Sequence, residues 1–229
     1  MKKIIAAVAA SSLLIGAANA ASIIIDDFDQ QLSAGVGLSG LAEVASNGDT
    51  YTSPSALEFN RTINVSSSAA LNDNVFIGNN TLTVNSGNLG TVIGAITWEL
   101  TDTTGGIDLT TSKAFEAGIV NGTVSSSNNV VMASLTLVSG LDTGTPISET
   151  VNFQINQGDI LLSVDVSNFV SVDLTDIDSI TLGYMSDEFE GVDFTLVDAL
   201  ITTPVPVPGA LPLMLAGLGF VAARRARRS

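Results

Sequence analysis

Hydrophobic and polar residues alternate along most of the chain between residues 22 and 203. In one such segment, Val151, Phe153 and Ile155 alternate with asparagine and glutamine. A period of two places successive side chains on opposite faces of a strand, and the frequent valine, isoleucine and threonine also favour strands. The pattern therefore predicts strands at 22–28, 56–65, 74–77, 81–85, 91–100, 130–138, 151–156, 160–166, 179–184 and 191–200.

Short clusters of glycine, asparagine, aspartate and serine separate these segments, for example at 47–49, 78–80, 86–88 and 156–158. Such clusters mark turns, and their spacing is typical of an all-β sandwich or barrel. We therefore expect an all-β domain of about ten strands, arranged as an antiparallel two-sheet sandwich with jelly-roll-like connections. Residues 113–119 could form a short helix.

The first twenty residues have the organisation of a secretory signal peptide. Two lysines precede a stretch at 4–17 that is apolar apart from Ser11 and Ser12, and Ala18 and Ala20 supply the small side chains of a cleavage site. This apolar stretch is too short to span a membrane comfortably. The pattern predicts a signal peptide at 1–20 and a mature domain at 21–203. The alternative is a buried N-terminal helix.

The C-terminal residues form a second uncharged stretch that ends in a basic cluster. Residues 204–223 contain no charged or polar side chain. Twenty helical residues span about 30 Å, the thickness of the hydrocarbon core of a bilayer, although the prolines place the helix start near Gly209. The pattern predicts a transmembrane helix whose C-terminal end is held on the cytoplasmic side by arginines. The arginines are Arg224, Arg225, Arg227 and Arg228.

A short proline motif opens this tail, and it consists of Val205, Pro206, Val207 and Pro208. Together with the hydrophobic span and the arginine cluster, it resembles the PEP-CTERM sorting signals of Gram-negative bacteria, in particular the variant written VPLPA. Val207 stands where that variant has leucine, Gly209 stands where it has alanine, and the glutamate of the standard motif is absent.

The resemblance covers residues 204–229 only. It implies recognition by an exosortase-type membrane enzyme, transient anchoring in the inner membrane and removal of the tail. It also implies delivery to the cell surface or to the exopolysaccharide matrix. A permanent C-terminal membrane anchor is the alternative.

The composition excludes several kinds of chemistry. The chain has no cysteine and no histidine, and its 23 acidic and 8 basic residues give a formal net charge of −15. Disulfides, thiolate metal sites, a cysteine nucleophile and an imidazole base are therefore excluded. The negative charge disfavours nucleic acid as a partner, because phosphates would be repelled. Only Arg61 and Lys113 carry positive charge away from the two ends. A carboxylate or Lys113 would be the sole base available to activate a serine nucleophile, and we predict that the protein is not an enzyme.

Acidic side chains are densest between residues 159 and 198. Carboxylates crowded in loops repel one another unless water or a cation separates them, and hard oxygen ligands suit Ca²⁺. No complete EF-hand loop is present, and a solvated acidic surface is the alternative. Asp26, Asp27 and Asp29 would join such a site if the terminal strands pair. The candidate Ca²⁺ ligands are Asp173, Asp176, Asp178, Asp187, Glu188 and Glu190.

The segments 23–29 and 191–198 begin and end the predicted domain. The first contains a hydrophobic-Asp-Asp-Phe phrase and the second is a strand that carries acids. They resemble the terminal strands of galactose-binding-type jelly rolls, which implies carbohydrate binding by analogy of fold alone. Aromatic residues that could stack on sugar rings are few, and Trp98 lies in an apolar run that favours a place in the core.

Three functional hypotheses follow. The first is an exported structural or adhesive component of exopolysaccharide or biofilm, with the processing enzyme, the polysaccharide and transiently the membrane as partners. The alternative is a carbohydrate-binding module, with Ca²⁺ as a candidate cofactor. The third is a glycosidase, which would need two carboxylates facing each other across a cleft.

Overall fold

The computed structural model describes residues 22–30, 36–38, 44–67, 73–78, 80–85, 92–102, 104–125, 130–156, 158–185 and 191–203. The signal peptide predicted at 1–20 and the sorting tail predicted at 204–229 lie outside these residues. Across the part of the chain that is described, no helix is both long enough and apolar enough to cross a membrane.

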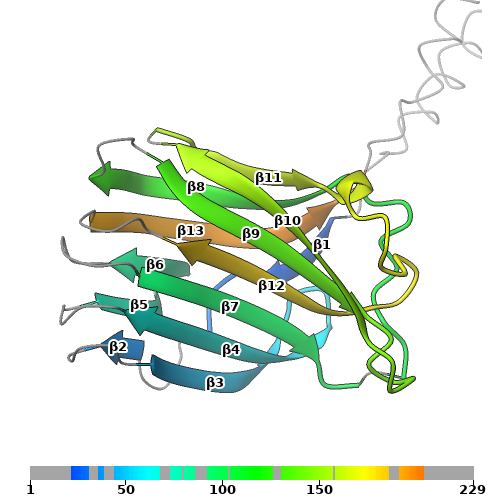
Figure 1. Ribbon diagram of the computed structural model, residues 1–229. Helices are drawn as coiled ribbons and strands as arrows, with labels where there is room; N and C mark the ends of the chain where they lie inside the picture. Colours follow the sequence, from blue (N-terminus) through cyan, green and yellow to red (C-terminus); the bar gives the residue numbers. More distant parts are fainter. Residues whose placement is uncertain are drawn as a thin grey trace, which may run out of the picture. The chain divides into compact units, whose positions relative to one another are not determined.

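Two antiparallel sheets pack face to face (Figure 1). Sheet A contains, in order, β11 (Leu161–Asp165), β8 (Ala114–Ser125), β13 (Gly191–Thr202), β6 (Thr81–Asn85), β5 (Asp73–Gly78) and β2 (Val36–Leu38), and β1 (Ile23–Asp26) pairs with β13. Sheet B contains, in order, β10 (Ile147–Asn156), β9 (Val130–Ser139), β12 (Ile177–Met185), β7 (Val92–Leu100), β4 (Glu58–Ser67) and β3 (Val44–Thr52). A short 3-10 helix, η1 (Val166–Asn168), follows β11.

The chain crosses repeatedly between the two sheets. The steps from β7 to β8, from β8 to β9 and from β10 to β11 each change sheet, as do the steps from β11 through β12 to β13. The first and last strands, β1 and β13, are antiparallel neighbours in sheet A. The predicted all-β, antiparallel two-sheet sandwich is therefore confirmed.

The core lies between the sheets because each strand directs alternate side chains inward. In β12, Ile180 and Leu182 are buried, whereas Thr181 between them is partly exposed. Trp98 of β7 is fully buried, and its ring lies 6.2 Å from that of Phe115 in β8, measured between centroids. Trp98 therefore belongs to the core, as its apolar surroundings in the sequence predicted.

The helix predicted at 113–119 is wrong, because this segment is the start of β8. Phe115, Ala117 and Ile119 are buried, while Glu116 and Gly118 between them are partly exposed. This is the period of a strand, and β8 pairs with β13 on one side and β11 on the other. The local helix preference of alanine and glutamate is outweighed by burial between two partner strands.

The turn predicted at 47–49 is also wrong, because these residues lie within β3 and pair with 61–63 of β4. Asp49 is held there by Arg61, whose Nε and Nη2 donate to its two carboxylate oxygens at 3.0 and 2.7 Å. A side-chain ion pair thus keeps a turn-forming sequence in an extended strand.

Arg61 also anchors the N-terminal strand. Its Nη1 donates to both carboxylate oxygens of Asp26, at 3.1 and 3.0 Å, and both side chains are fully buried. Trp98 Nε1 and the Phe28 backbone N–H donate to the same carboxylate, each at 2.8 Å. Burial raises the pKa of Asp26 above its ordinary 3.8, and Arg61 and Trp98 oppose that shift. The Asp26 carboxylate is therefore bound by groups within the fold itself.

Candidate functional site

The outer face of sheet B, which points away from the core, is built from in-register rows of side chains. One row, the threonine row, crosses five strands and consists of Thr150, Thr136, Thr181, Thr97 and Thr62. Hydroxyl oxygens of neighbouring threonines lie 2.9 Å apart between Thr97 and Thr181, and 2.8 Å apart between Thr136 and Thr150. Threonines on adjacent strands therefore hold one another's side chains in fixed positions.

The next row along the strands has the smallest side chains. This small row consists of Asn152, Ser134, Gly183, Ala95 and Asn64. A Cβ atom at Gly183 would lie 2.6 Å from Ser134 Oγ, so the two strands approach closely here. Because these side chains are short, the small row forms a shallow depression across the outer face of the sheet.

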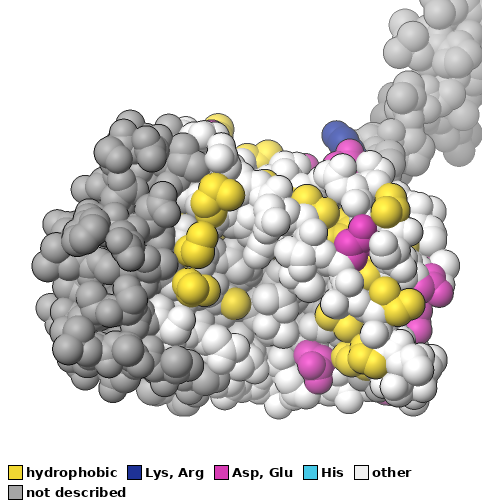
Figure 2. All heavy atoms as spheres, viewed as in Figure 1, with side chains coloured by type: hydrophobic (Ala, Val, Ile, Leu, Met, Phe, Trp, Pro, Cys, Tyr) yellow, Lys and Arg dark blue, Asp and Glu magenta, His cyan; other side chains and the backbone are white. Residues whose placement is uncertain are grey.

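The third row is partly apolar. This mixed row consists of Gln154, Met132, Met185, Ile93 and Ser66. Met132, Met185 and Ile93 are 38%, 40% and 51% exposed. Figure 2 shows hydrophobic side chains in a short line on the face of the sandwich formed by sheet B. Three adjacent strands thus present apolar side chains to solvent beside the small row.

A shallow groove of about 490 Å³ follows from this arrangement. Ala95, Ser134 and Gly183 line it from the small row, and Thr181 lines it from the threonine row. Met132, Met185 and Ile93 line it from the mixed row. The groove therefore has apolar side chains along one edge and a hydroxyl group on the other.

None of the positions in the three rows carries a charge, although the chain as a whole has a formal net charge of −15. Acidic side chains lie toward the right-hand part of the same view (Figure 2). Threonine, serine, asparagine and glutamine can each donate and accept hydrogen bonds. The part of the outer face of sheet B that the three rows cover is thus neutral and rich in hydrogen-bonding groups, and the exposed Glu58 of β4 and Glu99 of β7 lie beyond it.

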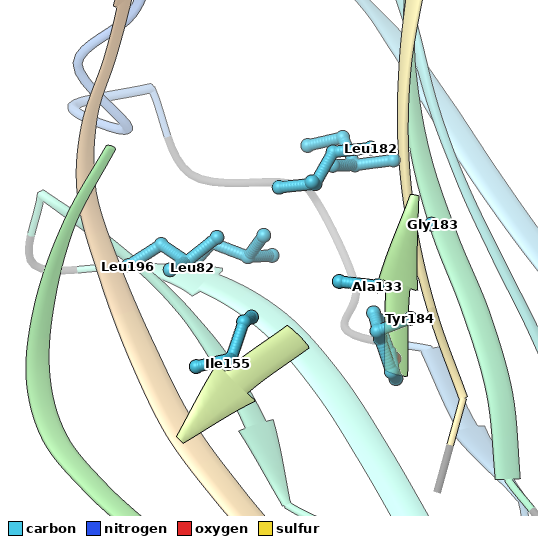
Figure 3. Close-up of a pocket in the computed structure, with 8 residues that line it drawn as sticks. Leu82, Ala133, Ile155, Leu182, Gly183, Tyr184 and Leu196 are labelled. Atoms are coloured by element: carbon cyan, nitrogen blue, oxygen red, sulfur yellow. The ribbon is translucent and has the colours of Figure 1, made fainter. Parts of the chain in front are cut away.

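A second hollow lies inside the sandwich and is only a packing void. Figure 3 shows Leu82 and Leu196 of sheet A directed toward Leu182 of sheet B. The void measures about 10 Å³ and its exposed lining is entirely apolar. This is about the space of one water-sized sphere, and it offers no polar group to a ligand.

The predicted Ca²⁺ ligands are only partly brought together. Asp176 and Asp178 converge with Asp142, and one carboxylate oxygen of each lies within 4.8 Å of the others. Asp173 is not in this group, and its Oδ1 accepts hydrogen bonds from the Thr175 backbone N–H and hydroxyl at 2.9 and 2.7 Å. These bonds hold the pKa of Asp173 below its ordinary 3.8.

The remaining predicted ligands fall elsewhere. Asp187, Glu188 and Glu190 lie outside the described residues. Asp26 is paired with Arg61, and Asp27 accepts a hydrogen bond of 2.7 Å from the Tyr51 hydroxyl. Asp142 was not predicted, because it belongs to the loop between β9 and β10 and no local spacing links it to Asp176.

No family model matches the sequence, and no curated protein matches it. The chain is similar to several solved structures. The solution structure of CtCBM11 gives a TM-score of 0.46 at 12% identity and covers 82% of this chain and 98% of its own.

Two further similar structures come from Clostridium thermocellum. The family 11 carbohydrate-binding module of cellulase Lic26A-Cel5E gives a TM-score of 0.42 at 13% identity, covering 81% of this chain and 96% of its own. The family 30 module of Cel9D-Cel44B gives 0.42 at 13% identity, covering 80% and 98%. At this level of similarity, a functional assignment has to come from the chain's own surface.

Proposed function

We propose that the β-sandwich binds a neutral polysaccharide along the outer face of sheet B, as a non-catalytic module of an exported surface or matrix protein. The observation that carries this proposal is the uncharged, hydroxyl-rich and amide-rich surface of the three rows with its shallow groove. An acidic protein without a binding role for these three rows would be expected to place some of its charge on them, as soluble surfaces usually do.

The chemistry of the face matches that of a neutral sugar chain. Sugar hydroxyls both donate and accept hydrogen bonds, and so do Thr181, Ser134 and Asn152 at the groove. The C–H faces of a sugar ring are apolar, and the flexible side chains of Met132 and Met185 can adapt their shape to them. A uronic acid chain would meet no cation on this face.

The groove favours binding over catalysis. Hydrolysis of a glycosidic bond requires a general acid and a second carboxylate positioned across the cleavage site. The rows that frame the groove offer hydroxyl, amide, thioether and alkyl groups instead. Because aromatic stacking is not offered by these rows either, we expect weak binding of single sugars, with dissociation constants on the order of 1 mM, that strengthens on long chains through repeated contacts.

Affinity electrophoresis of the full-length protein in mild detergent tests the binding proposal. Gels containing neutral glucans, xylan or galactomannan should retard the protein, whereas gels containing alginate or pectate should not. Asn152→Asp places a charge beside the groove and should abolish the retardation. Asn168→Asp makes the same change on η1 and serves as the matched control. Equal retardation of both variants in neutral gels, or migration unaffected by every neutral polysaccharide, would refute the proposal.

Export and sorting belong to the same proposal and rest on the two ends of the sequence. A tail that resembles PEP-CTERM signals would deliver the sandwich to a surface rich in polysaccharide, which is where a sugar-binding face is useful. Replacing Arg224, Arg225, Arg227 and Arg228 with glutamine should leave the protein unprocessed in the membrane fraction. Unchanged delivery of that variant to the cell surface would count against sorting by this tail.

A further inference from the structure

Three loops meet at one end of the sandwich and are tied together by backbone hydrogen bonds. Ile107, in the β7–β8 loop, exchanges two hydrogen bonds with Ile177 at the start of β12, at 2.8 and 3.1 Å. The Leu109 N–H donates to the Leu174 carbonyl at 2.7 Å. The Asp173 N–H donates to Ser139 Oγ, at the end of β9, at 3.1 Å. The loop end is therefore held in place by contacts other than its carboxylates.

Asp142, Asp176 and Asp178 converge within this frame. Asp142 is exposed, Asp176 is partly exposed and Asp178 is fully buried, and one carboxylate oxygen of each lies within 4.8 Å of the others. Asp178 sits at the irregularity where the pairing of β12 with β9 shifts register. The cluster therefore runs from the surface to the interior, with an accessible carboxylate at its outer side.

The backbone of neighbouring loops positions two of these carboxylates. The Gly106 N–H donates to Asp176 Oδ1 at 2.6 Å, and the Leu141 N–H donates to Asp178 Oδ2 at 2.8 Å. A Cβ atom at Gly106 would lie 2.5 Å from the Asp176 carbonyl carbon, so only glycine allows this approach. Both aspartates are thus fixed before any ligand arrives, which lowers the cost of ordering them on binding.

The second oxygen of Asp178 has no hydrogen-bond partner among the described residues. Asp178 Oδ1 is buried, and the side chain as a whole is 0% exposed. A buried carboxylate oxygen without a donor is costly, and two further carboxylates nearby add repulsion. A cation bound between these carboxylates would therefore stabilise the cluster.

Among the described residues, no cationic side chain forms a salt bridge with this cluster. In the described part of the chain, both salt bridges are made by Arg61, and their partners are Asp26 and Asp49. Apart from Arg61, the sequence between the two basic ends contains Lys113 alone as a cationic side chain. The partner for the cluster is thus expected to come from solution.

We propose that Asp142, Asp176 and Asp178 bind a Ca²⁺ ion. An all-oxygen donor set suits a hard cation, and the chain has no histidine or cysteine for a softer metal. Ca²⁺ accepts six to eight oxygens in flexible arrangements, whereas Mg²⁺ requires a small octahedral site and keeps several waters. Three carboxylates supply between three and six oxygens, and backbone carbonyls or water supply the rest.

The ion would join the β9–β10 loop, through Asp142, to the start of β12, through Asp176 and Asp178. The bound ion would stabilise the folded state without contacting the groove. The proposal is independent of carbohydrate binding, since none of the three aspartates lines that groove.

Thermal unfolding of the full-length protein tests the site, after the protein has been stripped of metal with EDTA and dialysed. Ca²⁺ at a hundredfold excess over its dissociation constant should raise Tm by about 5–10 °C for a domain of this size. Mg²⁺ at the same concentration should raise it less. Isothermal titration with CaCl₂ should give one binding event per chain.

Asp142→Asn carries the decisive comparison, because this side chain is exposed and the substitution leaves the buried contacts intact. It should weaken Ca²⁺ binding at least tenfold while leaving the Tm in EDTA at or above that of the parent. Glu99→Gln removes an exposed carboxylate from β7 and is the matched control, with unchanged Ca²⁺ binding. Absence of a Ca²⁺ effect on the parent protein overturns the proposal. So does an equal Ca²⁺ effect in both variants, which would indicate screening of the net charge.

Discussion

At the scale of single residues, one arginine, Arg61, pairs with two carboxylates and also contacts an aromatic ring. Arg61 binds the buried Asp26 on one side and the partly exposed Asp49 on the other, and its guanidinium carbon lies 4.7 Å from the centre of the Tyr51 ring. Its Nη2 also donates to the Gln30 carbonyl at 2.8 Å. The guanidinium therefore connects β4 to β3 and to the N-terminal strand at the same time.

Replacing Arg61 should therefore destabilise the folded state strongly. Arg61→Met keeps much of the side-chain volume but leaves Asp26 buried without its ion partner, and we expect a loss of about 3–5 kcal/mol in the free energy of unfolding. Asp49→Asn should cost clearly less, about 1 kcal/mol, because the Asp49 side chain is 25% exposed and water can replace part of its interaction. Urea denaturation followed by Trp98 fluorescence measures both values. Losses of equal size in the two variants would show that burial of Asp26 is not the dominant cost.

At the scale of strands, the alternating pattern predicted most of the sandwich but not every strand. The strands at 179–184 and 151–156 were predicted because their polar and apolar residues alternate without interruption. In β8, alanine and glutamate masked the alternation, and in β3 the sequence Asn47-Gly48-Asp49 imitated a turn. Both errors arise where pairing with distant strands, β13 for β8 and β4 for β3, overrides local preference.

The candidate sites were less predictable than the strands. Asp176 and Asp178 were predicted as ligands because they are close in sequence, but Asp142 lies in another loop and only the fold brings it near. The threonine row was missed for the same reason, since Thr62, Thr97 and Thr181 are far apart in the sequence. A signal was nonetheless present in β4, whose outward positions at 60–66 hold asparagine, threonine and serine where charged residues are commoner.

Strand packing beneath the groove depends on a large residue paired with a small one. Tyr184 of β12 lies opposite Gly94 of β7, and a Cβ atom at Gly94 would collide with the Tyr184 ring. Gly94→Ala should therefore reduce the free energy of unfolding by about 1–3 kcal/mol through overpacking. Combining it with Tyr184→Leu should cost less than the sum of the two single changes, because the smaller side chain relieves the clash. A double-mutant cycle in urea measures this coupling, and strictly additive losses would contradict it.

At the scale of the whole molecule, charge is distributed unevenly. The acidic residues that give the chain its net charge of −15 leave the three rows on the outer face of sheet B uncharged, and three of them gather at the loop end around Asp178. The sandwich therefore combines a neutral patch, formed by the three rows, with an acidic end. These two regions should respond differently to ionic conditions, because screening by salt acts on charges and not on hydroxyl groups.

Polysaccharide binding should therefore be nearly independent of salt. Neutral hydrogen-bonding groups and apolar contacts carry it, so the dissociation constant for a neutral glucan should change less than about twofold between roughly 0.05 and 0.5 M NaCl. Binding of Ca²⁺ to the aspartate cluster should weaken over the same range, because the attraction of the −15 protein for cations is screened. Isothermal titration of both ligands across the salt series gives the comparison. A strong salt dependence of glucan binding would mean that charged residues outside the three rows make the main contacts, and the three rows would then not be the binding surface.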